Sequence, residues 1–443
     1  MRDIKHIIEK KSLFGRKSPR KNSNVTACKQ LLNEPEQKKR RLKVALPVVA
    51  MILAAYPLVS VFVSAKNAVS SVDVRAVAGT PKKINSPELF RLGAEALPSS
   101  TFSDGRLLAT LPDGGTILYG IDEEVQTRVS KVLEDNRVPY GAFVALEPKT
   151  GKILAMKGHS SIDPGWEQQS VYGLYPMASL FKIITATAAL ELNKVTSDTL
   201  FAFRGGLTSE NPRYWDVRQG RHNQQMPLDL AMGKSVNPVF GRLASEFAGR
   251  DSIVSCTERY GFNQIIFPTP AMPSTSVVPQ TDDELRLMGA GLCKEVKISP
   301  LHAASIIAAI ANDGVMMQPM LARELRNGKG EVVFAETPHE VRRIVAPETA
   351  RELTKMLATT VSAGTSRKAF RMWRGQPKLA SIQVAAKTGS INGTSPAGHY
   401  SWFVAYAPVN DPQIAVAALI VNQDKWRIKA SHVGEQALEA FFR

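Results

Sequence analysis

Residues 401–421 of the 443-residue chain read SWFVAYAPVNDPQIAVAALIV, two apolar runs that Asp411-Pro412 separates. Runs of aromatic, β-branched and small apolar residues on either side of a turn signal predict two paired strands. A third such run, Ile382–Ala386, lies upstream beyond Asn392-Gly393, and Ser431–Phe442 has the pattern of an amphipathic helix. The C-terminal part of the chain therefore predicts a sheet followed by a helix.

Two hairpin patterns precede this region, Leu107–Leu111 with Thr116–Gly120 and Ala142–Leu146 with Ile153–Met156. Strand patterns at both ends of the folded region around a helical middle predict one mixed α/β (α+β) domain, with a central antiparallel sheet and a helical subdomain. The predicted helices cover Glu123–Asn136, Ala178–Leu192, Leu228–Met232, Pro238–Phe247 and Pro300–Ala311.

The formal net charge of +16 is unevenly distributed, because residues 1–43 hold 14 lysines and arginines against four acidic residues. An enzyme that acts on nucleic acid is expected to carry its basic patch on the folded body, so we expect no nucleic-acid partner. Three cysteines are too few for a disulfide scaffold. Without a HExxH motif or paired CxxC motifs, the sequence predicts neither a metal nor another cofactor.

Val44–Ala65 contains 22 residues without a charge. At 1.5 Å per helical residue it would reach about 33 Å, enough to cross a bilayer. Lys38–Arg41 precedes it, so the positive-inside rule places the N-terminus in the cytoplasm. A cleaved signal peptide is the alternative, but the basic region and the apolar stretch are both long for one. The predicted order is a cytoplasmic tail (1–43), a transmembrane signal anchor (44–65), a linker with the first strand (66–115) and one folded domain (116–443).

Ser179-Leu180-Phe181-Lys182 forms a Ser-x-x-Lys motif at the start of an apolar helix pattern. Residues at i and i+3 share a helix face, so the Lys182 amine can reach the Ser179 hydroxyl. Serine is a weak nucleophile unless a neighbour takes its proton, and a lysine does this only if its pKa is lowered. The motif predicts an activated serine.

Two further motifs follow, Ser235-Val236-Asn237 and Lys387-Thr388-Gly389-Ser390. A serine hydroxyl can relay a proton, an asparagine amide can hold a peptide carbonyl, and a cation with two hydroxyls suits a carboxylate. Each motif alone is weak, since Lys149-Thr150-Gly151 repeats one of them in a plain turn pattern. Their order, with spacings of 56 and 152 residues, is what distinguishes them.

In this order the motifs resemble those of penicillin-binding proteins and serine β-lactamases. Residues 116–443 are similar to a penicillin-binding transpeptidase domain in other segments too, among them Gly141–Met156 and Trp402–Pro408. The resemblance implies the penicillin-binding transpeptidase fold and a peptidoglycan D,D-transpeptidase that β-lactams inhibit. It implies that the catalytic residues are Ser179 (nucleophile), Lys182 (its activator) and Ser235 (proton donor to the leaving D-alanine), and that Asn237, Lys387, Thr388, Gly389 and Ser390 bind substrate.

Two departures limit the resemblance. Met177-Ala178 stands where the family commonly has a glycine before the serine, and the roughly 50 residues between Ala65 and Thr116 leave no room for a glycosyltransferase or a large pedestal domain. Hydrolysis by a D,D-carboxypeptidase or endopeptidase, and a non-catalytic sensor of peptidoglycan or β-lactams, stay open as alternatives. The expected location is the bacterial cytoplasmic membrane with the catalytic domain outside, and the expected partners are stem peptides, the membrane and a lipid-II polymerase. Cys256 and Cys293 are either free thiols or a disulfide pair.

Overall fold

The computed structural model describes residues 84–220, 223–372 and 375–443, which belong to a single unit, Lys83–Arg443. The predicted cytoplasmic tail, the anchor at Val44–Ala65 and the first part of the predicted linker lie outside the described residues. Within the described ranges, no helix has both the length and the apolar composition needed to cross a bilayer.

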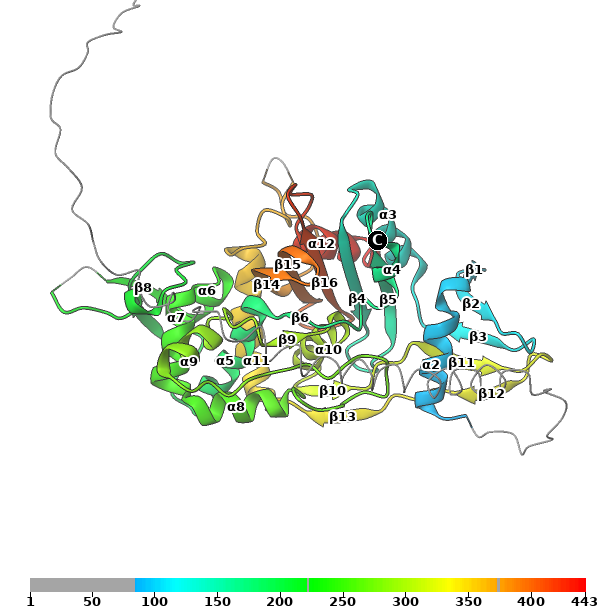
Figure 1. Cartoon of the computed structure of the whole chain (residues 1–443), viewed down its shortest axis with the longest axis horizontal. Helices are drawn as coiled ribbons and strands as arrows, with labels where there is room; N and C mark the ends of the chain where they lie inside the picture. The colour runs from blue at the N-terminus through cyan, green and yellow to red at the C-terminus, as the bar shows by residue number, and fades with distance from the viewer. Residues whose placement is uncertain (1–83, 221–222, 373–374) are drawn as a thin grey trace, which may run out of the picture. The chain divides into compact units, whose positions relative to one another are not determined.

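A sheet of five antiparallel strands lies at the centre, with helices over both faces (Figure 1). The sheet has an apolar layer on each face. Phe143 and Phe403 belong to the layer on one face, and their strand neighbours Val144 and Val404 belong to the layer on the other. This follows from the alternation of side chains along a strand. The predicted mixed α/β class with a central antiparallel sheet is therefore confirmed. In spatial order the strands are β14 (Ala385–Thr394), β15 (Ala397–Ala407), β16 (Ile414–Asn422), β4 (Tyr140–Leu146) and β5 (Ile153–His159). The layer that contains Phe143 lies beneath α3 (Glu123–Asp135) and α12 (Ala430–Phe441), and the layer that contains Val144 lies beneath α10 (Pro300–Ala311).

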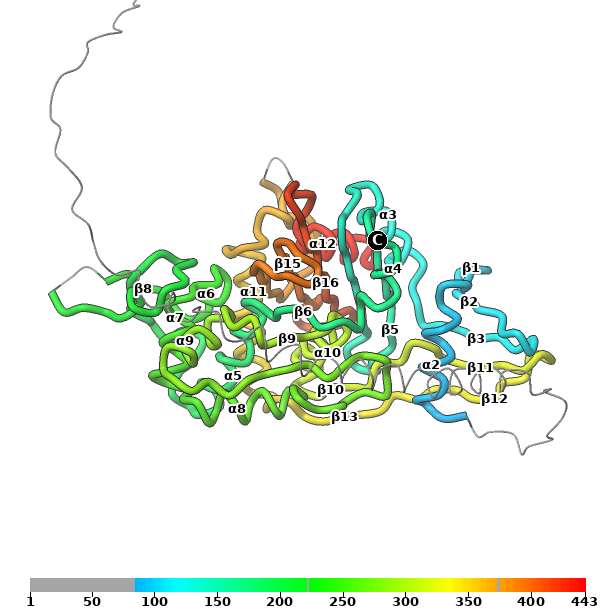
Figure 2. Tube along the Cα trace, viewed as in Figure 1, coloured from blue at the N-terminus to red at the C-terminus, as the bar shows by residue number. Residues whose placement is uncertain are grey.

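The helical subdomain is the green part of the trace in Figure 2. Cys256 is buried there and Cys293 is partly exposed, and both are free thiols. The subdomain contains η3 (Ala178–Phe181), α5 (Lys182–Glu191), α6 (Leu228–Gly233), α7 (Asn237–Arg242), the π-helix η5 (Leu243–Ala248), α8 (Arg250–Arg259) and α9 (Asp282–Gly289); α11 (Pro347–Ser362) packs against α6 and β14. The two-stranded pairs are β6 (Tyr175–Pro176) with β9 (Lys297–Ile298), β7 (Leu200–Phe203) with β8 (Gln224–Pro227), and β10 (Val315–Met317) with β13 (Glu340–Arg343).

A second five-stranded sheet occupies part of the region predicted to be linker. Asn85 caps the N-terminus of helix α2 (Ser86–Ala96): its side chain accepts a hydrogen bond from the backbone N–H of Glu88. The helix buries Leu89 and Phe90. An asparagine cap with a proline in the first turn is a strong helix start. The strands, in spatial order, are β1 (Thr101–Ser103), β2 (Arg106–Thr110), β3 (Thr116–Tyr119), β11 (Ala322–Arg326) and β12 (Val332–Ala335).

Strand β14 differs from its prediction, which ended at Ala386 and took Asn392-Gly393 as a turn. The strand begins at Ala385 and continues in register, with Asn392 opposite His399 and Gly393 opposite Gly398. The chain reverses at Ser395-Pro396 instead, because that proline has no N–H for the ladder. The Lys387–Ser390 motif consequently lies inside a long strand rather than at the end of a short one.

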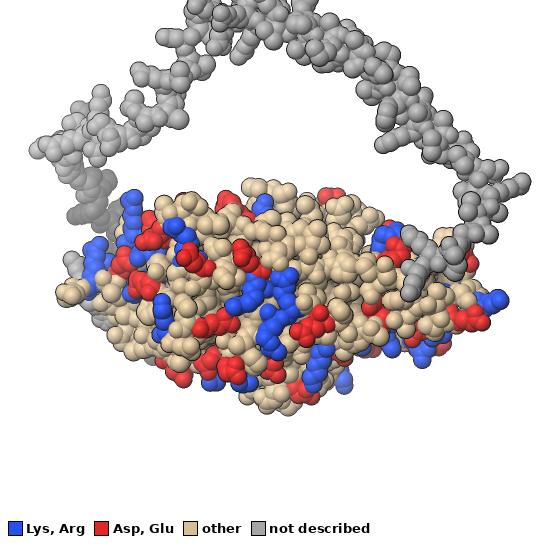
Figure 3. Space-filling model, turned by 90° about the horizontal axis from the view of Figure 1, so that it is seen from below, with Lys and Arg blue, Asp and Glu red and all other residues tan. Residues whose placement is uncertain are grey.

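Surface charge on the described body is mixed. On the face shown in Figure 3, lysine and arginine side chains alternate with acidic ones. This agrees with the small net charge of +6 left for residues 44–443 once the basic N-terminal stretch is set aside.

Candidate active site

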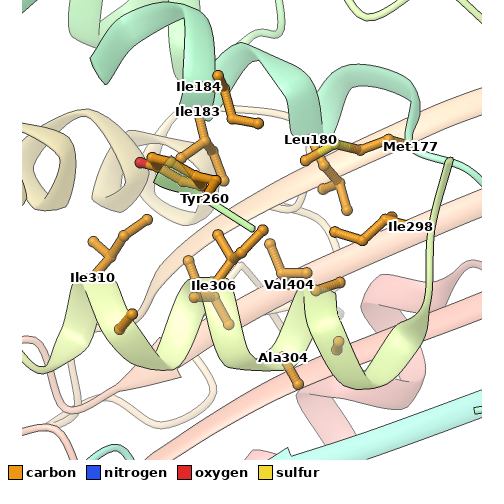
Figure 4. Close-up of a cluster of buried hydrophobic side chains, with 14 of the residues drawn as sticks. Met177, Leu180, Ile183, Ile184, Tyr260, Ile298, Ala304, Ile306, Ile310 and Val404 are labelled. Carbon is orange, nitrogen blue, oxygen red and sulfur yellow. The ribbon is translucent and has the colours of Figure 1, made fainter. Parts of the chain in front are cut away.

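Ser179 lies in the short 3-10 helix η3, where the sequence predicts the first turn of a continuous α-helix. In a 3-10 helix, side chains at i and i+3 stand directly above each other, so this local geometry places Lys182 over Ser179. The approach to the turn is fixed by β6, where the Pro176 carbonyl accepts a hydrogen bond from Trp402 Nε1 at 2.8 Å. Figure 4 shows the buried apolar side chains of the core next to this segment; they include Met177, Leu180, Ile183, Ile298, Ile306, Ile310 and Val404.

The Lys182 side chain is completely buried. Its Nζ lies 2.7 Å from Ser179 Oγ, and it donates to Asn237 Oδ1 at 2.8 Å and to the Ala290 carbonyl at 2.5 Å. Burial lowers the pKa of Lys182 well below that of an ordinary lysine, and the positive charge of Lys387 lowers it further. A neutral amine has two N–H donors and one lone pair. With both donors occupied by Asn237 and Ala290, the lone pair is left to face the Ser179 hydroxyl.

Ser235 lies between α6 and α7, in the left-handed region with φ of +57°. Its hydroxyl accepts a hydrogen bond from Lys387 Nζ at 2.9 Å, and the same Nζ donates to the Thr388 carbonyl at 2.8 Å. Burial lowers the pKa of Lys387 to about 7. These two contacts use two of the three N–H donors of a cationic lysine. The structure thus brings the second and third motifs together.

The rest of the Lys387–Ser390 motif lines the same edge of the central sheet. The Thr388 hydroxyl is half-buried, Gly389 is buried and Ser390 is exposed. A Cβ built at Gly389 would stand 3.4 Å from the backbone nitrogen of Ser179, so this strand passes directly beside the serine. All eight predicted site residues therefore lie on a continuous set of contacts or next to it.

Two groups in this set were not predicted from the sequence as site residues. The Ala290 carbonyl, at the end of α9, has no motif that would reveal it. Thr365, after α11, has its Oγ1 2.6 Å from Thr388 Oγ1; it lies outside the three motifs.

A separate cleft of about 470 Å³ lies between β3, β11 and the start of α3. Its lining contains Arg106, Lys152 and Arg323 but no serine, threonine or cysteine, so it offers no nucleophile of the serine or cysteine type. In the described part of the chain, no group of three or more histidine, cysteine, aspartate or glutamate side chains is placed to hold a metal ion.

Comparison with known proteins places this geometry among cell-wall enzymes. The family described as penicillin binding protein transpeptidase domain matches residues 141–442. Peptidoglycan D,D-transpeptidase PbpA of Mycolicibacterium smegmatis is 28% identical over 357 residues, which cover 70% of this chain and 68% of the relative. Its counterpart of the same name in Mycobacterium tuberculosis is 29% identical over 64% of this chain and 62% of the relative, so the chain spans about two thirds of the length of these relatives.

Solved structures give the same result. The crystal structure of PBPA from M. tuberculosis has a TM-score of 0.61 at 25% identity and covers 74% of this chain and 83% of its own. The imipenem acyl-enzyme complex of M. tuberculosis penicillin-binding protein A has a TM-score of 0.60 at 25% identity, covering 74% and 80%. A D,D-transpeptidase domain from Eggerthella lenta has a TM-score of 0.63 at 26% identity, covering 79% and 90%.

Proposed function

Because the chain belongs to the family of penicillin-binding protein transpeptidase domains, we propose that it is a peptidoglycan D,D-transpeptidase whose Ser179 carries the acyl group and is trapped by β-lactams. One observation carries the proposal. The buried Lys182 amine lies 2.7 Å from Ser179 Oγ, and Asn237 and Ala290 occupy its other two directions. This arrangement favours the neutral amine that a serine nucleophile requires.

In the acylation step, Ser179 Oγ attacks the carbonyl carbon of the penultimate D-alanine of a stem peptide, and Lys182 accepts the hydroxyl proton. The C–N bond to the terminal D-alanine breaks, and the Ser235 hydroxyl gives its proton to the leaving amine. Lys387 lies 2.9 Å from Ser235 Oγ and can replace that proton. The backbone N–H groups of Ser179 and Ser390 are the proposed donors to the developing oxyanion.

In the second step, the amine of a neighbouring stem peptide attacks the ester carbon. It loses a proton to the basic groups of the site, Ser179 regains its hydroxyl, and an amide cross-link results. In the donor complex, Thr388, Ser390 and the remaining N–H of Lys387 hold the terminal carboxylate, since charge-assisted hydrogen bonds are the strongest available for it. Asn237 binds the peptide backbone, and Gly389 lets the donor approach the strand edge. No cofactor is needed for either step.

The substrate, peptidoglycan, lies outside the cytoplasmic membrane, which agrees with the predicted topology. We propose that Val44–Ala65, outside the described residues, anchors the catalytic domain on the outer side of that membrane. A lipid-II polymerase that supplies uncross-linked strands is the proposed partner.

Intact-protein mass spectrometry of the chain mixed with benzylpenicillin tests the proposal. The expected result is a stable adduct with the mass of the whole antibiotic, absent from Ser179→Ala and present in the control Ser362→Ala, which removes a hydroxyl from the exposed end of α11. An adduct that disappears within seconds would instead indicate a β-lactamase, and no adduct would leave a sensor as the better reading.

Cross-linking needs a separate measurement, because a carboxypeptidase forms the same acyl-enzyme. A pentapeptide stem ending in D-Ala-D-Ala is incubated with the enzyme and a D-amino acid as acceptor. A transpeptidase yields the exchanged peptide, and a carboxypeptidase yields only the tetrapeptide. Exclusive hydrolysis would refute transfer.

A further inference from the structure

The loop after helix α11 lies between the helix that precedes the second motif and the strand that carries the third, and contacts both. Thr365 lies in this loop and is exposed, and it contacts the strand that carries Thr388. We infer that Thr365 is a positioning residue that turns the Thr388 hydroxyl proton toward the carboxylate of the donor peptide. This inference rests on the proposed function, since it needs a carboxylate ligand at Thr388.

Three contacts fix Thr365. Its Oγ1 lies 2.6 Å from Thr388 Oγ1. Its backbone N–H donates to the carbonyl of Gly233 at 3.0 Å, and its hydroxyl reaches that carbonyl at 3.4 Å. Gly233 is the last residue of α6, two residues before Ser235. A single residue therefore joins the end of the helix before Ser235 to the strand of Thr388.

Close packing holds the loop in this place. A Cβ built at Gly364 would stand 2.1 Å from the Gly233 carbonyl oxygen and 2.8 Å from Thr360 Cα. Both atoms belong to the backbone and cannot yield, so only glycine fits here. The loop backbone is consequently held against α6, which places Thr365 beside Thr388.

The positioning role follows from counting protons. Thr388 has one hydroxyl proton, and a carboxylate only accepts hydrogen bonds. If Thr388 donates to Thr365, it has no proton for the ligand. If Thr365 donates to Thr388, the Thr388 proton is free to point at the ligand. The two consecutive hydrogen bonds then strengthen each other. The Gly233 carbonyl competes weakly for the Thr365 proton, because its hydroxyl contact of 3.4 Å is much longer than the 2.6 Å contact to Thr388.

The experiment compares benzylpenicillin with its methyl ester, which lacks the anionic carboxylate. The second-order rate constant of acylation is measured with each compound, and their ratio gives the preference for the carboxylate. Thr365→Val keeps the shape of the side chain and removes the hydroxyl. We expect it to lower this ratio about five- to tenfold, the worth of one hydrogen bond between neutral groups. Thr365→Ser restores the hydroxyl and is expected to restore the ratio.

Thr359→Val is the matched control. Thr359 lies on α11, the helix before the loop, and its hydroxyl donates to the Asp229 carbonyl of α6 at 2.6 Å, so it too contacts the backbone of α6 but does not contact Thr388. We expect its ratio to equal that of the wild type.

Two results would overturn the inference. One is an unchanged ratio in Thr365→Val. The other is an equal loss of rate with both compounds, which marks a purely structural role. Failure of the proposed function looks different, because the wild type itself would then form no adduct with either compound.

Discussion

The chemistry of the site depends on one buried amine. Lys182 forms no ion pair with any acidic residue in the part of the chain that the structure describes; its contacts are the hydroxyl of Ser179, the amide oxygen of Asn237 and the carbonyl of Ala290. Neutral acceptors compensate a positive charge less well than a carboxylate does, so burial dominates and lowers the pKa of Lys182. In the proposed mechanism, Lys182 can act as a base at neutral pH because no acidic side chain in the described part of the chain pairs with it.

Asn237→Asp tests this reasoning. The change keeps an acceptor oxygen beside Lys182 and adds a negative charge, which favours the protonated amine and raises the pKa of Lys182. More of the lysine is then cationic at neutral pH and unable to take the Ser179 proton. We expect acylation by benzylpenicillin to fall about tenfold or more at neutral pH, which corresponds to one pH unit in the protonation equilibrium, and to recover as the pH rises.

The measurement is the pH profile of the second-order acylation rate constant. The acid limb is expected to move to higher pH in Asn237→Asp and to stay in place in Asn327→Asp, a control on the exposed turn between β11 and β12. Loss of the Asn237 amide contact to the Ser209 carbonyl acts at every pH. A reduction of the same size across the whole profile would therefore contradict the charge argument.

At the scale of elements, long periodic segments could be predicted closely and short ones could not. Helix α10 has the predicted bounds and α12 is offset by one residue, because each has several turns of apolar pattern. Helix α2 was assigned to a linker, although Leu89, Phe90 and Gly93 are buried along one face of it, because the surrounding segment is rich in serine, proline, glycine and alanine and the helix has only 11 residues. The Asn392-Gly393 pair has strong turn propensity, but its ladder with β15 overrides that preference.

The candidate site likewise contains residues that could be predicted from the sequence and groups that could not. The eight predicted residues could be identified because their motifs occur in a fixed order, which sequence alone displays. The Ala290 carbonyl and the Thr365 hydroxyl could not, because a backbone oxygen has no sequence signature and Thr365 contacts its partner only through the packing of α11 on α6. Motifs thus indicate the reacting groups, while the contacts that orient them depend on tertiary structure.

The turn after α9 is an element whose backbone positions the base. Gly291 has φ of +75°, and a Cβ there would stand 2.3 Å from the Ala178 carbonyl oxygen. Gly291→Ala should therefore shift the adjoining Ala290 carbonyl away from Lys182 and displace the residue before Ser179. We expect acylation to fall about 100-fold, as for a misplacement of the order of 1 Å in an active site.

Gly249→Ala is the control for backbone strain alone. Gly249 has φ of +81° and no atom within 4 Å of the added Cβ. Both substitutions are expected to lower the unfolding free energy, because an alanine at either positive φ is strained, and Gly249, with ψ of 160°, lies in a region that is essentially limited to glycine. Only Gly291→Ala should lose acylation, measured with benzylpenicillin at a temperature where both variants are folded. Parallel losses of activity would show that strain rather than the contact matters.

At the scale of the whole molecule, the small sheet and the catalytic body share one hydrophobic core. Leu89, Leu107 and Ile117 from the small sheet and its helix belong to the same buried cluster as Leu180 and Ile307. The Tyr119 hydroxyl donates to the Gly93 carbonyl at 2.8 Å and fastens α2 to β3. Residues 84–115, which the sequence assigns to the linker, are therefore part of the folded unit, and the predicted domain start at residue 116 falls inside a sheet.

This continuity predicts different stabilities for two shortened chains. A chain that begins at Ile84 retains the whole small sheet, whereas one that begins at Thr116 loses α2, β1 and β2. The shorter chain gives up the burial of Leu89, Phe90 and Leu107, each 5% exposed or less. At about 1.5–3 kcal/mol for each large apolar side chain, the expected loss of unfolding free energy is roughly 5–9 kcal/mol.

Urea unfolding of both chains measures this difference, and benzylpenicillin acylation at low temperature reports on the site. The contacts of Lys182 and Lys387 all lie beyond residue 116, so both chains should form the adduct while they are folded. Equal unfolding free energies would mean that the small sheet is an appendage rather than part of the core. A stable shorter chain without an adduct would mean that the small sheet supports the geometry around Ser179, which the hydrogen bonds of Lys182 and Lys387 give no reason to expect, because none of them involves the small sheet.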